Sequence, residues 1–166
     1  MKHSSFDNLP ALSHQDALQI LSRPIDQLEY FSDYYKAVFH LEKYPCPETE
    51  DALLSLVKSV SSEQAVVIAR RKALEVLARL GCTRAIPIIA QSLKSFDPYL
   101  VENAAWALQE LNCHDKEIHE VMVDLLDDPR QHRRVLIKSL SALHVSSSIE
   151  PIKALINDPL VEKPVR

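Results

Sequence analysis

Residues 96–111, FDPYLVENAAWALQEL, decide the fold, because their pattern returns further along the chain. An Asp-Pro pair opens a helix-like run here, and the same pair opens runs at 127–143 (DDPRQHRRVLIKSLSAL) and 157–166 (NDPLVEKPVR). The pairs Asp97-Pro98, Asp128-Pro129 and Asp158-Pro159 lie 31 and 30 residues apart. Aspartate accepts hydrogen bonds from the unpaired N–H groups of a first helical turn, and proline tolerates the first helical position. The pairs therefore predict three helix starts in successive repeats.

Each predicted first helix carries a small or apolar residue, followed by apolar residues four and seven positions later. The four sets are Ala37, Leu41 and Tyr44; Ala73, Leu77 and Leu80; Ala104, Leu108 and Leu111; and Leu136, Leu140 and Leu143. Offsets of four and seven place side chains on one helical face. We therefore expect one face of every first helix to be buried.

A second apolar helix is predicted after a short turn in each repeat. These second helices are TEDALLSLVKSV, RAIPIIAQSLK, KEIHEVMVDLL and SIEPIKALI. In the last three, the expected apolar positions are Ile86, Ile89 and Leu93; Ile118, Val121 and Leu125; and Ile149, Ile152 and Leu155. Such a helix–turn–helix unit cannot bury its apolar face alone, so stacked neighbours have to cover it.

The sequence therefore predicts an all-α superhelix of about four helical pairs. The pairs are expected at about 33–60, 63–95, 97–126 and 128–157, with a further repeat starting at 158–166. Residues 1–32 look different and are expected to form an N-terminal helical cap, with Ser13 capping one helix. Val161 and Val165 have no partner helix in this arrangement. We expect either that the natural chain continues or that another chain covers this end.

Composition excludes several classes of function. The 166 residues include one glycine, Gly81, against an average usage of about 7%. Phosphate-binding loops and dinucleotide fingerprints need several glycines, so both are excluded. The net charge of -4 is spread over interspersed acidic and basic residues, which gives no basic field for nucleic acid. No stretch approaches the roughly 18 apolar residues of a membrane span. Three widely spaced cysteines, without a signal region, favour a cytoplasmic location.

The chain resembles HEAT-repeat proteins of the phycobilisome (bilin) lyase type over roughly residues 33–166. The segments that carry the resemblance are DPYLVENAAWALQEL, DPRQHRRVLIKSLSAL, ARRKALEVLARLG, RAIPIIAQSL and SDYYKAVFHL. The last of these, with Tyr34-Tyr35, is similar to the paired-tyrosine helix start of bilin lyase subunits. The resemblance implies a HEAT-like solenoid.

The resemblance also implies a function, which fold alone does not. It implies a protein-interaction module in phycobiliprotein maturation, with a phycobiliprotein subunit or a second HEAT-repeat subunit as partner. No intrinsic cofactor is expected, and a bilin would be bound transiently. If the chain is an enzyme, it would be a chromophore transferase acting with a partner subunit. The alternative is a scaffold in another assembly pathway, such as iron–sulfur cluster maturation. A metal-dependent hydroxylase of the same repeat family is disfavoured, because the chain has a single His-Glu pair, His119-Glu120.

Candidate partner-binding residues are basic or aromatic and lie mostly near the starts of first helices. They are Tyr34, Tyr35, Arg70, Arg71, Tyr99, Trp106, Arg133 and Arg134. Stacked layers would align the arginines in a basic ridge that suits acidic proteins or bilin propionates. Aromatic residues are frequent binding hot spots. The alternative for each is ordinary packing or a solvated helix face.

The three cysteines share one repeat position. Cys46, Cys82 and Cys113 each follow the small residue of a first helix by nine positions, and Val145 is the fourth equivalent. Stacked layers about 8 to 10 Å apart cannot bring three sulfurs to one zinc ion, so no metal site is expected. A small apolar side chain that seals each turn is the favoured interpretation. A thiol contact with bilin or a cluster-transfer partner is the alternative. No catalytic residue is identified.

Overall fold

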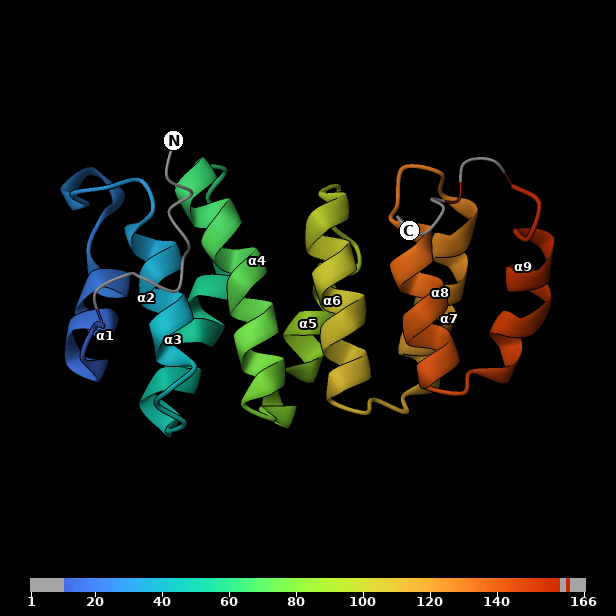
Figure 1. Ribbon diagram of the computed structural model, residues 1–166, viewed down its shortest axis with the longest axis horizontal. Coiled ribbons are helices and arrows are strands. Elements are labelled where there is room, and N and C mark those ends of the chain that lie inside the picture. Colours follow the sequence, from blue (N-terminus) through green and yellow to red (C-terminus); the bar gives the residue numbers. More distant parts are fainter. Residues whose placement is uncertain (1–10, 159–160, 162–166) are drawn as a thin grey trace. The chain divides into compact units, whose positions relative to one another are not determined.

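The computed structural model describes residues 11–158 and 161, and all the regular structure within these ranges is helical (Figure 1). The chain divides into two compact units, one ending at Val76 and the other beginning at Leu77. The predicted all-α fold is confirmed. Across the described ranges, no helix is both long enough and apolar enough to cross a membrane.

The first unit contains the expected N-terminal helix and the first helical pair. Its elements are α1 (His14–Ser22), the 3-10 turn η2 (Ile25–Gln27), α2 (Asp33–Leu41), α3 (Pro47–Lys58) and the first part of α4 (Gln64–Arg79). Ser13 caps α1 as predicted, because its hydroxyl accepts a hydrogen bond from the Asp16 N–H at 3.1 Å. Helix α1 packs against α2 and α3.

The second unit contains the remaining pairs. Its elements are η3 (Thr83–Ala85), α5 (Ile86–Ser92), α6 (Pro98–Glu110), α7 (Lys116–Asp124), η4 (Leu125–Asp127), α8 (Arg133–Ala142), η5 (Ser146–Ser148) and α9 (Ile149–Ala154). Helix α6 packs against α5 and α8, so first helices of consecutive repeats lie side by side. The expected repeat at 158–166 lies mostly outside the described residues, Pro159 and Val165 included.

The predicted phase of the first helices is confirmed. The small residue of each set and the leucine four positions later are 0% exposed in all four repeats: Ala37, Leu41, Ala73, Leu77, Ala104, Leu108, Leu136 and Leu140. The third position of each set is less regular. Tyr44, Leu80 and Leu111 are half-buried, whereas Leu143 is buried. Among the three positions of each set, the first two therefore contribute most consistently to the core.

The predicted phase of the second helices is correct for α5 and one residue off for α7. Ile89 in α5 and Leu93, which directly follows α5, are buried, but the buried residues of α7 and η4 are Met122 and Leu126. The physical reason is the preceding turn. The buried Met122 follows Cys113 by nine residues, whereas Ile89 follows Cys82 by seven, and Asp115 caps α7. Helix α9 has no buried residue, and Ile149 is 51% exposed.

Three first helices end in the same way. Gly81, Asn112 and His144 have φ angles of 68°, 50° and 55°. The next residue in each case donates its N–H to the carbonyl five residues back, as in Cys82 to Leu77 at 3.0 Å. This is the Schellman motif, in which a left-handed residue ends the helix and the following side chain packs back on it. Repetition of the motif gives the repeats their short turns.

The Asp-Pro pairs do not all start helices. Asp97-Pro98 does so as predicted, because the Asp97 carboxylate accepts the Tyr99 N–H at 3.1 Å and Pro98 is the first residue of α6. The prediction at Asp128-Pro129 is wrong, since α8 begins only at Arg133.

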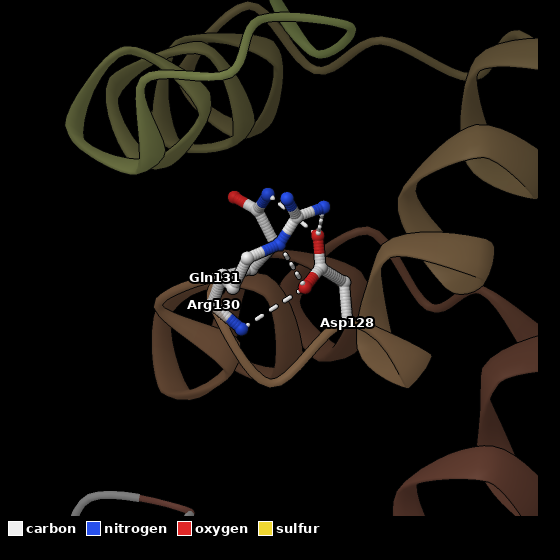
Figure 2. Close-up of polar contacts among 3 residues, drawn as sticks. All are labelled: Asp128, Arg130 and Gln131. Atoms are coloured by element: carbon white, nitrogen blue, oxygen red, sulfur yellow. Dashed lines mark hydrogen bonds and ion pairs between the residues drawn. The ribbon is translucent and has the colours of Figure 1, made fainter.

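The carboxylate of Asp128 closes a local turn instead (Figure 2). It accepts hydrogen bonds from the Arg130 N–H at 3.0 Å, from Arg130 Nε and Nη2 at 2.9 Å, and from the Gln131 amide at 3.1 Å. The Arg130 side chain first, then its backbone N–H and Gln131, hold the pKa of Asp128 well below its usual range. Such local side-chain bonds compete with helix formation.

Candidate functional site

The paired tyrosines at the start of α2 are largely internal. Tyr34 is 6% exposed, and its hydroxyl donates a hydrogen bond to the Arg23 carbonyl at 2.5 Å. Tyr35 is half-buried. Of the two interpretations of Tyr34, packing fits the structure, because the side chain is buried and its hydroxyl ties α2 to the end of α1.

The arginines of α4 are also partly used inside their own unit. Arg70 is half-buried, and its Nη1 donates to the Ser59 carbonyl at 2.5 Å, which fixes the connection between α3 and α4. Arg71 is half-buried as well. Next to them, Lys72 forms an ion pair with Glu75 at 2.9 Å. Arg70 therefore fixes the connection between α3 and α4, and Lys72 forms an ion pair within α4.

The two arginines at the start of α8 differ sharply. Arg133 is buried, and its Nη1 lies 3.0 Å from the Asp158 carboxylate. Arg134 is exposed. The expectation that both project from a basic ridge is corrected for Arg133, whose charge is neutralised by an ion pair within the fold. Arg70 and Arg71 belong to the other unit.

The starts of α6 and α8 bring three polar side chains together. His132 Nδ1 is hydrogen-bonded to the Glu102 carboxylate. The His132 ring also meets the Tyr99 ring edge to face, with 4.7 Å between centroids. Tyr99 is 53% exposed, and Phe96, just before α6, is 94% exposed. We name Phe96, Tyr99, Glu102, His132 and Arg134 the α6–α8 edge. It combines aromatic surface with charges of both signs.

Trp106 lies elsewhere on α6. Its side chain is half-buried, and the guanidinium carbon of Arg79 lies 6.0 Å from the ring centroid. A cation at this distance from an indole face is weakly attracted to it. Trp106 is thus partly packed within its unit and partly accessible to a partner. Its role in binding stays a prediction.

The cysteines occupy two kinds of environment. Cys82 and Cys113 are 3% and 4% exposed and, with Val145, follow the left-handed residue of the Schellman motif. Cys46 is half-buried and precedes α3, with its sulfur 3.5 Å from His14 Nε2 and 3.4 Å from Thr49 Oγ1. The expected sealing role fits the first two. Cys46 differs because the α2–α3 turn has Pro45 in place of a left-handed residue.

The His119-Glu120 pair does not stand in a metal-binding cluster. His119 Nε2 is hydrogen-bonded to the Cys113 carbonyl at 2.8 Å, which fixes the ring against the preceding turn. Within the part of the chain that the structure describes, no group of three or more His, Cys, Asp or Glu side chains is arranged to hold a metal ion.

The repeat itself is found in known proteins. Residues 69–95, which contain most of α4 and α5, match the family model described as the PBS lyase HEAT-like repeat. One chain in the structure of the complex of CpcE and CpcF of phycocyanin lyase from Nostoc sp. PCC7120 matches with a TM-score of 0.73 and 24% identity. The match covers 96% of this chain and 64% of that one. At this identity the match shows the fold alone.

Two curated relatives are more similar in sequence. The chain is 43% identical over 123 residues to the bilin biosynthesis protein CpeY of Synechococcus sp. (strain WH8020), covering 74% of this chain and 29% of that protein. It is 35% identical over 147 residues to the uncharacterized phycocyanin operon protein Y of Pseudanabaena tenuis (strain PCC 7409), covering 89% of this chain and 35% of that protein. The chain spans about a third of the length of these relatives.

These similarities and the geometry define the class of protein. The chain is a HEAT-repeat protein. The repeat at residues 69–95 is of the phycobilisome-lyase type, as the sequence predicted.

Sequence reasoning missed the contact between His132 and Glu102. The signal was present, because the two residues lie 30 positions apart, which is close to one repeat. Residues at matching places in neighbouring repeats become neighbours in space. The exposure of Phe96 had no comparable signal, since an apolar residue beside a turn is buried or exposed according to its tertiary surroundings.

Proposed function

We propose that the chain is a HEAT-repeat protein-interaction module that assists bilin attachment to phycobiliproteins. It would hold a phycobiliprotein subunit, or a second HEAT-repeat subunit, while the bilin is transferred. The observation that carries the proposal is the 43% identity to a bilin biosynthesis protein over 74% of this chain. The solved relative is a complex of two proteins, CpcE and CpcF, which supports a protein partner.

The α6–α8 edge is the surface best suited to this role. Tyr99 and Phe96 offer exposed aromatic area, and aromatic side chains supply much of the energy in protein interfaces. Arg134 is exposed and can pair with carboxylates of an acidic partner. The bond between His132 and Glu102 restrains two side chains, which lowers the entropy lost on binding.

The test is coexpression of the natural full-length protein with a phycobiliprotein subunit and a bilin source. Covalent attachment is measured as bilin absorbance that remains on the subunit after denaturation, and association is measured by copurification. The double variant Tyr99→Ala with Arg134→Glu should reduce both. Lys116→Glu, an exposed charge reversal at the start of α7, is the matched control. If the double variant keeps both association and attachment at the parental level, the α6–α8 edge does not have this role.

The chain's own thiols are not required in this proposal. Replacing all three cysteines by Ala or Val should leave attachment largely intact. One result would favour a thiol-transfer mechanism over an interaction module. In it, the folded cysteine-free protein loses all activity, while the variant with Tyr99→Ala and Arg134→Glu works normally. None of the named relatives points to iron–sulfur cluster assembly, so that alternative has no support from them.

A further inference from the structure

A second surface lies in the first unit, beside the connection between α1 and α2 (blue in Figure 1). A groove of about 460 Å³ opens there, lined by Ile25, Leu28, Tyr30 and Phe31 from the connection and by residues 63–65 at the start of α4. Three of the apolar side chains are well exposed: Ile25 at 37%, Tyr30 at 58% and Phe31 at 57%. Single exposed apolar residues are normal, but a group that lines one groove marks an interaction site.

The connection is held in shape by its own polar contacts. One oxygen of the Asp33 carboxylate accepts the N–H groups of Glu29 at 3.1 Å and Tyr30 at 2.8 Å. The Asp33 N–H in turn donates to the Tyr30 carbonyl at 3.0 Å. Lys36 lies 5.0 Å from the centroid of the Tyr30 ring and is 3.8 Å from Asp33. The aromatic pair is therefore presented by an ordered loop, which lowers the cost of binding.

The surroundings of the groove are acidic. Between Arg23 and Asp33 the chain carries three acidic residues, Asp26, Glu29 and Asp33, and one basic residue. Glu63 adds a further carboxylate to the lining. A hydrogen bond to Glu29 and the charge of that carboxylate raise the pKa of Tyr30 above its ordinary value, and Asp33 adds to this. The groove therefore joins an apolar floor to surroundings in which four carboxylates outnumber the two basic side chains Arg23 and Lys36.

We propose that this groove docks an amphipathic segment of a protein partner whose apolar face is flanked by lysine or arginine. The apolar face would cover Tyr30 and Phe31, and the basic flanks would meet Glu29 and Glu63. Complementary charges across an interface favour encounter and select against partners of the wrong sign. The acidic surroundings also disfavour a free bilin, because its propionates would meet carboxylates.

The proposal goes beyond the role assigned to the α6–α8 edge, and it involves none of the same residues. A negative result at one surface therefore leaves the other unaffected. A peptide test also needs no phycobiliprotein, so its failure is distinguishable from failure of the proposed function.

The probes are two synthetic amphipathic helical peptides with identical leucine faces, one with lysine on the polar face and one with glutamate. Each is titrated into the isotope-labelled full chain at low salt, and backbone amide shifts are followed by NMR. The lysine peptide should shift residues 25–33 and 63–65 and bind more tightly than the glutamate peptide. Raising the salt should reduce the difference, because exposed charges are screened over about 8 to 10 Å.

Two sets of variants separate apolar and electrostatic contributions. Tyr30→Ser with Phe31→Ser should weaken the lysine peptide about tenfold or more, as expected for hot-spot removal. Ile156→Ser is the matched control, because Ile156 is an apolar residue that is 74% exposed, lies in the other unit and belongs to neither surface. Glu29→Lys with Glu63→Lys should reverse the preference toward the glutamate peptide. Unchanged amide shifts outside the loop would show that each variant is folded.

Several results would overturn the proposal. Equal affinity for the two peptides would mean unspecific apolar adhesion. Shifts that map away from the groove would place the contact elsewhere. Saturable shifts of the groove residues by free biliverdin, with no response to the lysine peptide, would make it a pigment site. A dimer that disappears in the Tyr30→Ser and Phe31→Ser variant would mean that a second copy of the chain occupies the groove.

Discussion

The buried guanidinium of Arg133 lies 3.0 Å from the carboxylate of Asp158, so the start of α8 is tied to the chain that follows α9. The two side chains are 5% and 25% exposed, so the arginine is almost completely removed from water. Within the described residues, Arg133 Nη2 is buried without a hydrogen-bond partner. The pair therefore supplies the principal compensation for a buried charge.

Removal of either partner should destabilise the protein. Asp158→Ala leaves the buried arginine without its counter-charge, and we expect a loss of about 1 to 3 kcal/mol in the free energy of unfolding. Arg133→Ala should cost a similar amount, because it also removes packing. Urea denaturation measures both. The control is Arg134→Ala, an exposed neighbour that should stay within about 0.5 kcal/mol of the parent. Equal losses at Arg133 and Arg134 would contradict the ion-pair assignment.

A buried carboxylate at Ala104 should be far more damaging. Ala104 is 0% exposed on α6, so Ala104→Glu buries an unpaired charge between packed helices. The expected cost is about 3 to 5 kcal/mol, measured by thermal or urea unfolding. Ala142→Glu makes the same change at an exposed position of α8 and should cost less than about 1 kcal/mol. If the two variants unfold alike, the repeat phase is wrong.

The repeats could be predicted because burial in first helices follows a simple local rule. The four-residue offset between Ala104 and Leu108 depends only on helical geometry, and it holds in every repeat. The helix start at Asp128 could not be predicted in the same way. Its carboxylate had a nearer partner in Arg130, and a local turn and a helix cap use the same residue types.

The candidate site was harder to predict, because exposure depends on tertiary contacts. Arg133 and Arg134 are adjacent and chemically identical, yet one is buried and the other exposed. The carboxylate that pairs with Arg133 is 25 positions further along the chain, in the third Asp-Pro pair, where the sequence predicted a helix start and not an ion pair. Tyr34 was a candidate for partner binding with packing as the alternative, and its hydroxyl donates a hydrogen bond to the Arg23 carbonyl. The periodicity of apolar residues does not predict which polar groups come within hydrogen-bonding distance of these side chains.

The three thiols should differ in reactivity. Cys46 is half-buried, whereas Cys82 and Cys113 are almost fully covered. A chromogenic disulfide reagent should therefore modify one thiol in the folded protein at least about tenfold faster than the other two, since reaction requires access to the sulfur. Cys46→Ser should abolish the fast phase. Equal rates for all three thiols in the folded protein, or a fast phase that remains after this substitution, would contradict the assignment of Cys46 as the accessible thiol.

Stability should fall as the pH drops below neutrality because of His40. Its side chain is 3% exposed, and its ring nitrogens have no hydrogen-bond partner among the described residues. Burial first, and then the charge of Lys43, lower the pKa of His40 below its ordinary value of 6.5. Below about pH 6.5 the unfolded chain therefore binds a proton that the folded chain does not. The free energy of unfolding decreases from about pH 7 toward the lowered pKa.

Urea unfolding at several pH values between about 7 and 5 measures this effect. His40→Leu should flatten the dependence of stability on pH in this range, because it removes the titrating group. His114→Gln replaces an exposed histidine and should keep the parental slope. A parental slope in His40→Leu would show that another group is responsible.

The helix ends of the repeats offer a last prediction about backbone conformation. His144 has a φ of 55° and Gly81 a φ of 68°, at equivalent positions after α8 and α4. A non-glycine residue in this left-handed region is strained by roughly 1 to 2 kcal/mol, whereas glycine adopts it readily at an entropic cost of roughly 0.5 to 1 kcal/mol. His144→Gly should therefore stabilise the protein by about 0.5 to 1 kcal/mol. Gly81→Ala should destabilise it by about 1 kcal/mol, although nothing lies within 4 Å of the added methyl group.

Urea unfolding measures both changes. The control is Ser141→Gly, an exposed substitution inside α8, which should be destabilising by roughly 0.5 kcal/mol. A loss of stability in His144→Gly as large as that in Ser141→Gly would show that position 144 is not held in the left-handed conformation.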